Sequence, residues 1–179
     1  MQKKGYFYPV GRDKNFRPII VFNATLFDPK DIETATLATI FVHEEVIGKM
    51  FIPGQVENWI IIYDLGGMGI TDIPMSAIKS STQRYSQNYG GRLYKMFVVN
   101  APGTIYFTWK MVSAFLDPVT VEKIKISKTN TDKSMFDNID PSQVEQKYGG
   151  KQPNRVSYWY FLIYSGPSAF PKESSTKSD

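Results

Sequence analysis

The sequence of 179 residues contains no cysteine and a single histidine, His43. Without cysteine the chain can form no disulfide, no thiolate metal site and no cysteine nucleophile. One histidine excludes metal sites built from several imidazoles, and a Ser-His-Asp triad would depend on His43 alone. No stretch approaches the roughly 18–20 apolar residues of a membrane-spanning helix, and the residues after Met1 lack the apolar region of a signal peptide. We expect one cytoplasmic domain with little scope for catalysis.

Aromatic residues are abundant, at 15% of the chain, so some ring surface could face something other than the core. The net charge is +4, but its distribution is uneven. Between Lys79 and Lys133 the sequence has nine basic and three acidic residues. This basic region is either an ordinary solvated face or a site for anions or a membrane surface. We expect no nucleic-acid partner, because dense Arg/Lys runs and RNA- or DNA-binding motifs are missing.

Strand-like and helix-like segments alternate along the chain, which predicts an α/β fold with a largely parallel sheet. Tyr6–Val10 and Pro18–Asn23 flank a polar turn and predict a hairpin. Trp59–Leu65 and Tyr94–Val99 are nearly continuous apolar runs, typical of strands that are covered on both faces. Glu122–Ile126 alternates and predicts a further strand.

Two segments have the periodicity of amphipathic helices, Asp31–Phe51 and Ile73–Tyr89. The first is expected to bury a face consisting of Leu37, Ile40, Phe41, Ile47 and Phe51. The second is expected to bury Met75, Ile78, Tyr85 and Tyr89.

The segment Gly103–Leu116 predicts a helix that is apolar on two separate sides. One stripe contains Ile105, Trp109, Val112 and Leu116, and the other contains Phe107, Met111 and Phe115. Such a helix is buried, lies at a membrane, or covers an apolar ligand with one side. At roughly 20 Å it is too short to span a bilayer.

The motifs around this helix resemble the CRAL-TRIO lipid-binding family, and within it the phosphatidylinositol/phosphatidylcholine transfer proteins. The resemblance extends over about residues 5–153. The residues that carry it are Gly11-Arg12-Asp13 with Arg17-Pro18-Ile19, Tyr63-Asp64-Leu65-Gly66-Gly67, Ser86-Gln87-Asn88-Tyr89 with Arg92, Asn100-Ala101-Pro102, Phe115 to Ile124, and Tyr148-Gly149-Gly150-Lys151.

This resemblance implies a sheet of about five mostly parallel strands flooring a hydrophobic cavity, with helices on its back and Gly103–Leu116 as a mobile gate. The cavity would be lined by Trp59, Ile61, Tyr63, Met96, Val98, Ile105, Trp109 and Val112. The gate would present Phe107, Met111 and Phe115 to the membrane. The implied function is to bind a lipid, such as phosphatidylinositol, and to transfer it between membranes. The alternative is a non-transferring interaction or membrane-targeting scaffold, whose pocket Trp59 and Trp109 could fill.

The resemblance assigns the lipid head group to Thr120, Lys123 and Arg92. The sequence departs from the family where Gly90-Gly91 stand in place of an acidic residue. It departs again where Trp59 and Ile61 replace the hydroxyl side chains that bind the phosphate of the choline lipid. We therefore expect no choline-lipid site, and a drier pocket leaves a sterol-like, retinoid-like or tocopherol-like ligand open.

Other candidate sites are weaker. Gly66, Gly67 and Gly69 follow a strand but lack the Gly-x-Gly-x-x-Gly spacing of a dinucleotide loop. We expect His43 to be a surface or capping histidine, and Asp64 has no catalytic partner that the sequence reveals. We predict no enzyme, no cofactor and no metal, but a monomer in transient contact with membrane surfaces. Residues 154–167 are expected to form a C-terminal extension, either an extra strand or the start of a further domain, and 168–179 a disordered tail.

Overall fold

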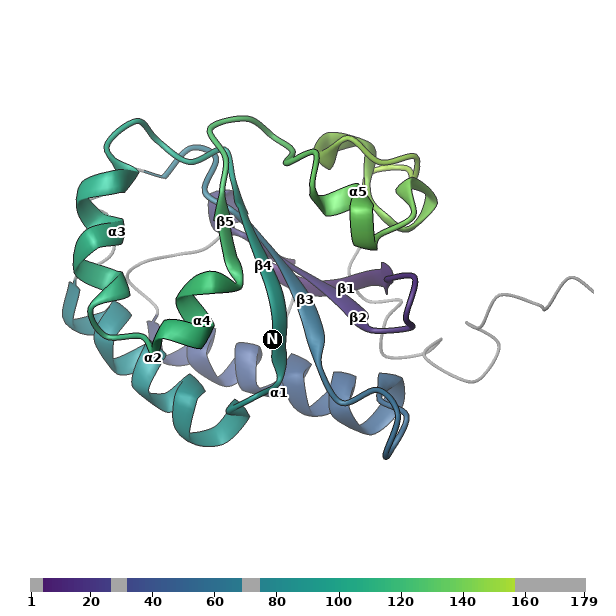
Figure 1. Cartoon of the computed structure of the whole chain (residues 1–179), viewed down its shortest axis with the longest axis horizontal. Coiled ribbons are helices and arrows are strands. Elements are labelled where there is room, and N and C mark those ends of the chain that lie inside the picture. The colour runs from purple at the N-terminus through teal and green to yellow at the C-terminus, as the bar shows by residue number, and fades with distance from the viewer. Residues whose placement is uncertain (1–4, 27–31, 69–74, 157–179) are drawn as a thin grey trace, which may run out of the picture.

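The computed structural model describes residues 5–26, 32–68 and 75–156. Five strands form one mixed sheet in the order β1-β2-β3-β4-β5 (Figure 1). The strands are β1 (Phe7–Arg12), β2 (Pro18–Asn23), β3 (Trp59–Asp64), β4 (Leu93–Val99) and β5 (Ile124–Ile126). The hairpin of β1 and β2 is antiparallel, whereas β2, β3, β4 and β5 are parallel neighbours. The predicted α/β class, hairpin and mostly parallel sheet are confirmed.

Helices cover the two faces of the sheet unequally. Figure 1 shows α1 and α2 beneath the sheet and α3 at its side. The C-terminal segment (residues 135–156, which include α5) lies across the opposite face. The helical elements are η1 (Ala24–Leu26), α1 (Ile32–Met50), α2 (Met75–Tyr89), α3 (Ile105–Ser113), α4 (Pro118–Glu122), α5 (Met135–Asn138), η2 (Pro141–Gln143) and η3 (Gln146–Tyr148).

The central strands are buried on both faces because their alternate side chains enter two separate core layers. On β2, Ile19 and Val21 pack toward the C-terminal segment, in a layer that includes Met135, Ile139 and Val144. Ile20 and Phe22 pack on the other side, toward α1. Continuous apolar runs therefore read correctly as strands that have no solvated face.

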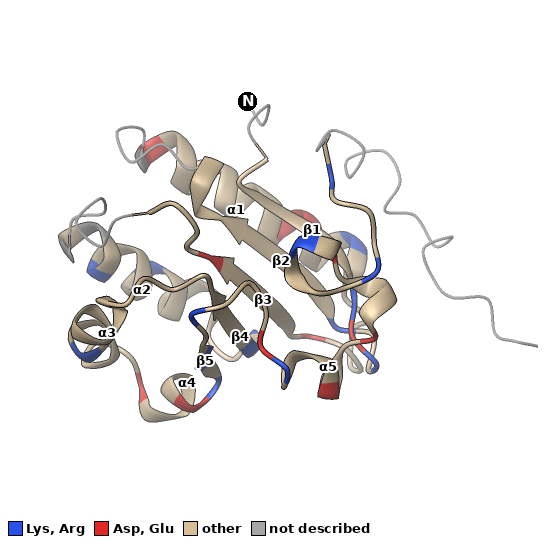
Figure 2. Cartoon of the chain, turned by 90° about the horizontal axis from the view of Figure 1, so that it is seen from above, with Lys and Arg blue, Asp and Glu red and all other residues tan. Residues whose placement is uncertain are grey.

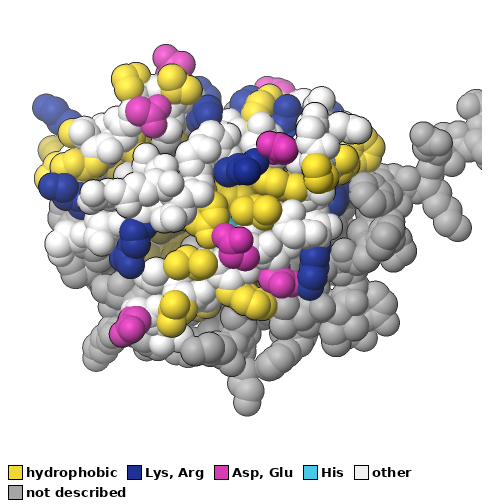
Figure 3. Space-filling view, turned by 90° about the horizontal axis from the view of Figure 1, so that it is seen from below, with side chains coloured by type: hydrophobic (Ala, Val, Ile, Leu, Met, Phe, Trp, Pro, Cys, Tyr) yellow, Lys and Arg dark blue, Asp and Glu magenta, His cyan; other side chains and the backbone are white. Residues whose placement is uncertain are grey.

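Helix α1 buries a different face from the one predicted. Its buried residues are the small ones, Ala35, Ala38, Val42 and Val46. Of the predicted face, Leu37, Ile40 and Phe41 are instead 53%, 41% and 44% exposed, whereas Ile47 and Phe51 are partly buried against the core. The periodicity was correct but the phase was wrong, because small side chains let the helix approach the sheet closely. Figure 3, which looks onto the side of α1 and α2, shows hydrophobic patches among the charged side chains.

The boundary between α4 and β5 also differs from the prediction. Glu122, expected at the start of a strand, is the last residue of α4, and β5 begins at Ile124. The short helix forms because Asp117 caps it, accepting a hydrogen bond from the Thr120 N–H at 2.8 Å, and because Pro118 occupies its first turn. The predicted helix Gly103–Leu116 is correspondingly shorter, since α3 ends at Ser113.

In the described residues, no helix combines the length and apolar character needed to cross a bilayer. Of the expected C-terminal extension only residues 154–156 belong to this described part. The rest of the extension and the expected tail, 168–179, lie outside it, as do Ile73 and Gly69.

Candidate functional site

The five strand residues predicted to line a cavity lie on one face of the sheet, the face toward α1 and α2. Trp59, Ile61 and Tyr63 alternate along β3, and the parallel register pairs Ile61 with Met96 and Tyr63 with Val98 on β4. Along β3 their burial decreases, since Trp59 is 0% and Ile61 3% exposed whereas Tyr63 is half-buried, but along β4 it increases toward the end of the strand. Met96 is half-buried and Val98 is buried. The sheet face is thus tightly packed at the start of β3 and less so toward its end.

An aromatic cluster fills the space around Trp59. Its ring lies 4.7 Å from that of His43 on α1, 5.6 Å from Phe51 and 5.7 Å from Tyr89 on α2, measured between ring centroids. The indole N–H of Trp59 has no hydrogen-bond acceptor in the described part of the chain. Little room for a ligand remains at this end of the strand.

The structure corrects the expected position of His43, which is fully buried rather than at the surface. His43 belongs to the face of α1 that was not expected to be buried. Its Nδ1 lies 2.7 Å from the Thr39 carbonyl oxygen, which can only accept, so Nδ1 carries the proton. Nε2 is then the acceptor for the Tyr85 hydroxyl of α2. Burial lowers the pKa of His43 to about 4, so the ring is neutral near pH 7.

Helix α3 has the two apolar sides that the sequence predicted, and none of its residues is buried. Ile105, Trp109 and Val112 are half-buried. On the other side, Phe107 is 79% and Met111 50% exposed, and Phe115, two residues beyond the end of the helix, is 43% exposed.

Two cation–ring contacts locate α3. The Lys79 ammonium of α2 lies 5.3 Å from the centroid of the Phe115 ring, and that of Lys128, just after β5, lies 5.6 Å from the Tyr106 ring. The helix therefore extends between the end of β5 and α2. Its half-buried side chains contribute apolar surface without the close packing of a core helix.

Tyr63 is the polar residue on the less tightly packed part of the sheet face. Its ring stacks on Phe22 at 4.4 Å between centroids, with the planes 15° apart. The hydroxyl makes no hydrogen bond with any residue that the structure describes. Part of the side chain remains accessible, yet burial raises its pKa to about 12.

The three predicted head-group residues lie at the same end of the sheet but have different partners. Arg92, just before β4, forms a 3.2 Å ion pair with Glu57 at the edge of an open polar hollow. The Thr120 hydroxyl donates to the Asp117 carboxylate at 2.6 Å. This bond, with that of the Thr120 N–H, lowers the pKa of Asp117, and the charge of Lys123 adds to the effect. Lys123 itself forms no ion pair within the described ranges.

A buried polar network that sequence reasoning missed lies where the chain enters α3. Asp64 at the end of β3 accepts hydrogen bonds from Gly66 N–H at 2.9 Å, the Asn100 amide at 2.8 Å and the Tyr148 hydroxyl at 3.0 Å. Burial and the Asp64 charge raise the pKa of Tyr148. Asn100 adopts a left-handed conformation, φ 52°, and Pro102 follows it before α3 begins. The network therefore fixes the segment from which α3 starts.

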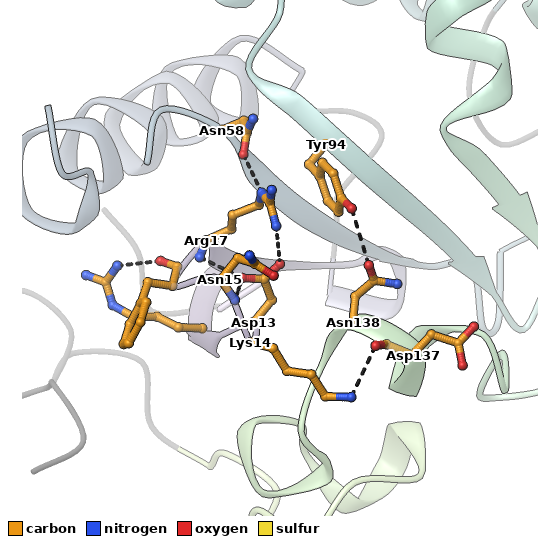
Figure 4. Close-up of polar contacts among 10 residues, drawn as sticks. Asp13, Lys14, Asn15, Arg17, Asn58, Tyr94, Asp137 and Asn138 are labelled. Atoms are coloured by element: carbon orange, nitrogen blue, oxygen red, sulfur yellow. Dashed lines mark hydrogen bonds and ion pairs between the residues drawn. The ribbon is translucent and has the colours of Figure 1, made fainter. Parts of the chain in front are cut away.

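The turn of the β1–β2 hairpin is held by charged residues with structural roles (Figure 4). Asp13 accepts hydrogen bonds from the backbone N–H groups of Asn15 and Arg17, both at 2.8 Å, and forms an ion pair with the Arg17 guanidinium. Arg17 also donates to Asn58 before β3, and Lys14 donates to the carbonyl of Asp137 on α5. These contacts join the hairpin turn to the segment before β3 and to α5.

Comparison with known proteins gives a consistent result. A family model described as the CRAL/TRIO domain matches residues 2–150. Over 148 residues the chain is 22% identical to a CRAL-TRIO domain-containing protein of Schizosaccharomyces pombe, covering 83% of this chain and 33% of that protein. It is 26% identical over 144 residues to phosphatidylinositol transfer protein CSR1 of Eremothecium gossypii, covering 79% and 32%. A third relative, the Sec14 cytosolic factor of S. pombe, is 32% identical over 99 residues, covering 54% and 35%.

The solved structure of Sfh5 superposes with a TM-score of 0.63 at 15% identity, covering 90% of this chain and 63% of that one, and so shares the fold. This chain spans about a third of the length of the curated relatives. The family model covers most of the chain, and the five-stranded sheet with its helices agrees with it. The chain belongs to the CRAL-TRIO family.

Proposed function

We propose that this chain binds a membrane lipid between the sheet and α3, and exchanges it when α3 moves at a membrane surface. The observation that carries the proposal is the state of α3, which is apolar on two sides and buries no residue. Together with the family and with relatives named as phosphatidylinositol transfer proteins, this favours a carrier.

The physical basis is the gain from covering apolar surface. Burying a lipid CH₂ group contributes roughly 0.8 kcal/mol relative to water. A lipid beneath Ile105, Trp109 and Val112 would complete the burial that the protein alone leaves unfinished. Because the lipid starts in an apolar bilayer, moving it into the protein releases far less free energy than moving it from water. The bound and bilayer states are then close in free energy, so the lipid can move in either direction.

The outer side of α3 supplies a surface for docking on a membrane. Phe107, Met111 and Phe115 would enter the bilayer interface. Basic residues lie close by, with Lys110 on α3 itself, Lys79 beside Phe115 and Lys128 beside Tyr106 (Figure 2). Apolar insertion combined with attraction to anionic lipids is typical of reversible peripheral binding. The chain would act as a monomer at the membrane surface.

Lys123 is the residue of the proposed head-group set that is free to contact a phosphate. Arg92 is paired with Glu57, and the Thr120 hydroxyl is engaged by Asp117. An ammonium contacts phosphate as a point charge. The phosphate belongs either to the head group of a bound phosphoinositide or to the bilayer at which the protein docks.

A vesicle assay tests the exchange function. Phe107→Ser is expected to reduce both vesicle binding and lipid transfer at least tenfold, because it removes a ring that is 79% exposed and available to the bilayer. The matched control is Phe41→Ser, which removes an equally apolar, 44% exposed ring from α1. If Phe107→Ser transfers lipid as fast as the unmodified protein, α3 is not the docking surface.

The packing of Trp59 favours a second candidate, a scaffold that holds no lipid. Its aromatic cluster fills one end of the sheet face, as expected of a scaffold with an occupied pocket. The half-buried Tyr63 and Trp109 favour the carrier, because a scaffold gains nothing from leaving them unpacked. Failure to take up any lipid from vesicles would decide for the scaffold.

A further inference from the structure

The back of the sheet, which is the face opposite α1 and α2, is covered unevenly. The C-terminal segment packs on it through Met135, Ile139 and Val144. Lys125 of the edge strand β5 lies on this same face, because its register partner is Phe97 of β4, a residue of the layer beneath the C-terminal segment. Lys125 is nevertheless exposed, so the C-terminal segment leaves this part of β5 in contact with solvent.

A second lysine, Lys95 of β4, lies on the back of the sheet beside Lys125. Its register partner is Ile60 of β3, which is also buried beneath the C-terminal segment. Phe97, the register partner of Lys125, is two residues further along β4 and on the same face. With neighbouring strands about 4.8 Å apart and a rise of about 3.3 Å per residue, the Cβ atoms of the two lysines are about 8 Å apart.

Neither of these lysines has a counter-ion in the described part of the chain. Lys125 is exposed and Lys95 is half-buried, with its ammonium 5.7 Å from the centroid of the Tyr94 ring. The acidic residue of the five strands, Asp64, lies at the other end of the sheet and is bonded to Tyr148. Neighbouring like charges repel, and a half-buried ammonium without a partner is costly. An anion bound between the two lysines would relieve both costs.

The groups that surround Lys95 have used their acceptors within the protein. The Arg17 guanidinium lies 3.8 Å from the centroid of the Tyr94 ring and is paired with Asp13. The Tyr94 hydroxyl donates to the side-chain oxygen of Asn138 at 3.3 Å, which leaves the Asn138 NH₂ group as a donor (Figure 4). Ammonium and amide donors without a competing acceptor suit the oxygens of a phosphate group.

The position of α5 favours a small solute over a membrane surface as the source of the phosphate. Asn138 is the last residue of α5, and its contact with Tyr94 places this helix directly beside the start of β4. A layer of chain packed on a sheet stands about 10 Å above it. A flat bilayer would therefore meet the C-terminal segment before it reached the half-buried Lys95, whereas a small molecule can enter the corner between them.

We propose that the back of β4 and β5 binds a small soluble molecule that carries two or more phosphate groups, held by the ammonium groups of Lys95 and Lys125. The site lies on the opposite face of the sheet from the proposed lipid site and does not depend on the carrier function. Two phosphates match two ammonium groups, and the flexible lysine stems allow each to approach its own phosphate. Lys95 contributes more than Lys125, because charges interact more strongly where water is partly excluded.

Titration calorimetry of the full chain at low salt tests the site, with inorganic tripolyphosphate as the first probe and inositol hexakisphosphate as the second. Lys95→Gln should lower the affinity roughly tenfold and Lys125→Gln roughly fourfold, since each removes one counter-charge. The matched control is Lys49→Gln on α1, which removes an exposed lysine from the other side of the sheet. It changes the net charge equally and should leave the affinity within about twofold.

Two results of this titration would overturn the proposal. The first is no measurable binding of either probe. The second is an equal loss of affinity in Lys49→Gln and Lys95→Gln, which would show that net charge alone attracts the anion.

Vesicles of phosphatidylcholine and phosphatidylserine distinguish a soluble ligand from lipid head groups. Lys95→Gln should bind these vesicles as well as Lys49→Gln does, because the C-terminal segment keeps a bilayer away from Lys95. Loss of vesicle binding in Lys95→Gln alone would overturn the proposal and assign this cation to a membrane contact.

Discussion

At the scale of single residues, His43 shows how burial couples the stability of the fold to pH. The imidazole is enclosed by the rings of Phe7, Trp59, Tyr85 and Tyr89, and it forms hydrogen bonds through both nitrogens. Glu44, the next residue, also contacts α2, where its carboxylate accepts a hydrogen bond from the Tyr89 hydroxyl. A proton on Nε2 would charge a buried group and would require the Tyr85 hydroxyl to accept the hydrogen bond that it otherwise donates.

The pH dependence follows from the pKa of His43, which is about 4 in the folded chain against an ordinary value of 6.5. Between these values the unfolded chain binds the proton more readily, so the free energy of unfolding falls as pH drops from about 6.5 to about 4. The loss approaches about 3 kcal/mol. Urea denaturation at several pH values measures it, with His43→Gln as the control that lacks this component. Identical pH profiles for the two proteins would contradict the burial of a neutral imidazole.

Asp64 illustrates a residue whose role the sequence could not reveal. Its partners Asn100 and Tyr148 are 36 and 84 positions away along the chain, and no local pattern connects them. Each belongs to a separate motif that carried the family resemblance. The motifs were visible, but their common purpose, the support of the segment before α3, required the fold.

At the scale of elements, small residues make up the buried face of α1, whereas several large apolar residues lie on its exposed face. Val46→Ala should lower the free energy of unfolding by about 2 kcal/mol, because it removes two methyl groups at a fully buried position. Leu37→Ala should change it by less than about 0.5 kcal/mol, since Leu37 is 53% exposed. Denaturant titration compares the two. If Leu37→Ala lowered the free energy of unfolding more than Val46→Ala, the buried face of α1 would be the one predicted from the sequence.

The strands were easier to predict than the helix faces, for a physical reason. A strand covered on both faces is apolar throughout, so its pattern has no phase to mistake, as in Ile60, Ile61 and Ile62. A helix such as α1, which carries apolar residues on more than one side, leaves its orientation undecided by periodicity. The two sides of α3 were recognised because aromatic residues mark both, and the side expected to face a membrane, with Phe107 and Met111, is the more exposed one.

At the scale of the whole molecule, polar and apolar features are segregated. The C-terminal segment covers one face of the sheet with a packed core and a polar network, while α3 leaves the other face incompletely covered near the end of β3. The basic region between Lys79 and Lys133 includes α3 and the turns beside it, where Tyr106 and Phe107 are exposed. This arrangement is suited to docking at an anionic surface close to the proposed lipid site.

For the predicted site residues, the positions in the fold could be predicted from the sequence, but the packing and the partners could not. The strand positions came together on one face because alternation along β3 and β4 determines them. The degree to which each is packed could not be predicted, since it depends on His43, Phe51 and Tyr89 from distant segments. The predicted head-group residues lie at one end of the sheet, and the partners of Arg92 and Thr120 became visible only in three dimensions.

The most direct test of the carrier is the stoichiometry of lipid bound to the purified full chain after exposure to vesicles, measured by native mass spectrometry. The account predicts one lipid per chain, released when fresh acceptor vesicles are added, because the apolar surface beneath α3 is incomplete without it. A chain that stays empty under these conditions would contradict the account and identify a scaffold.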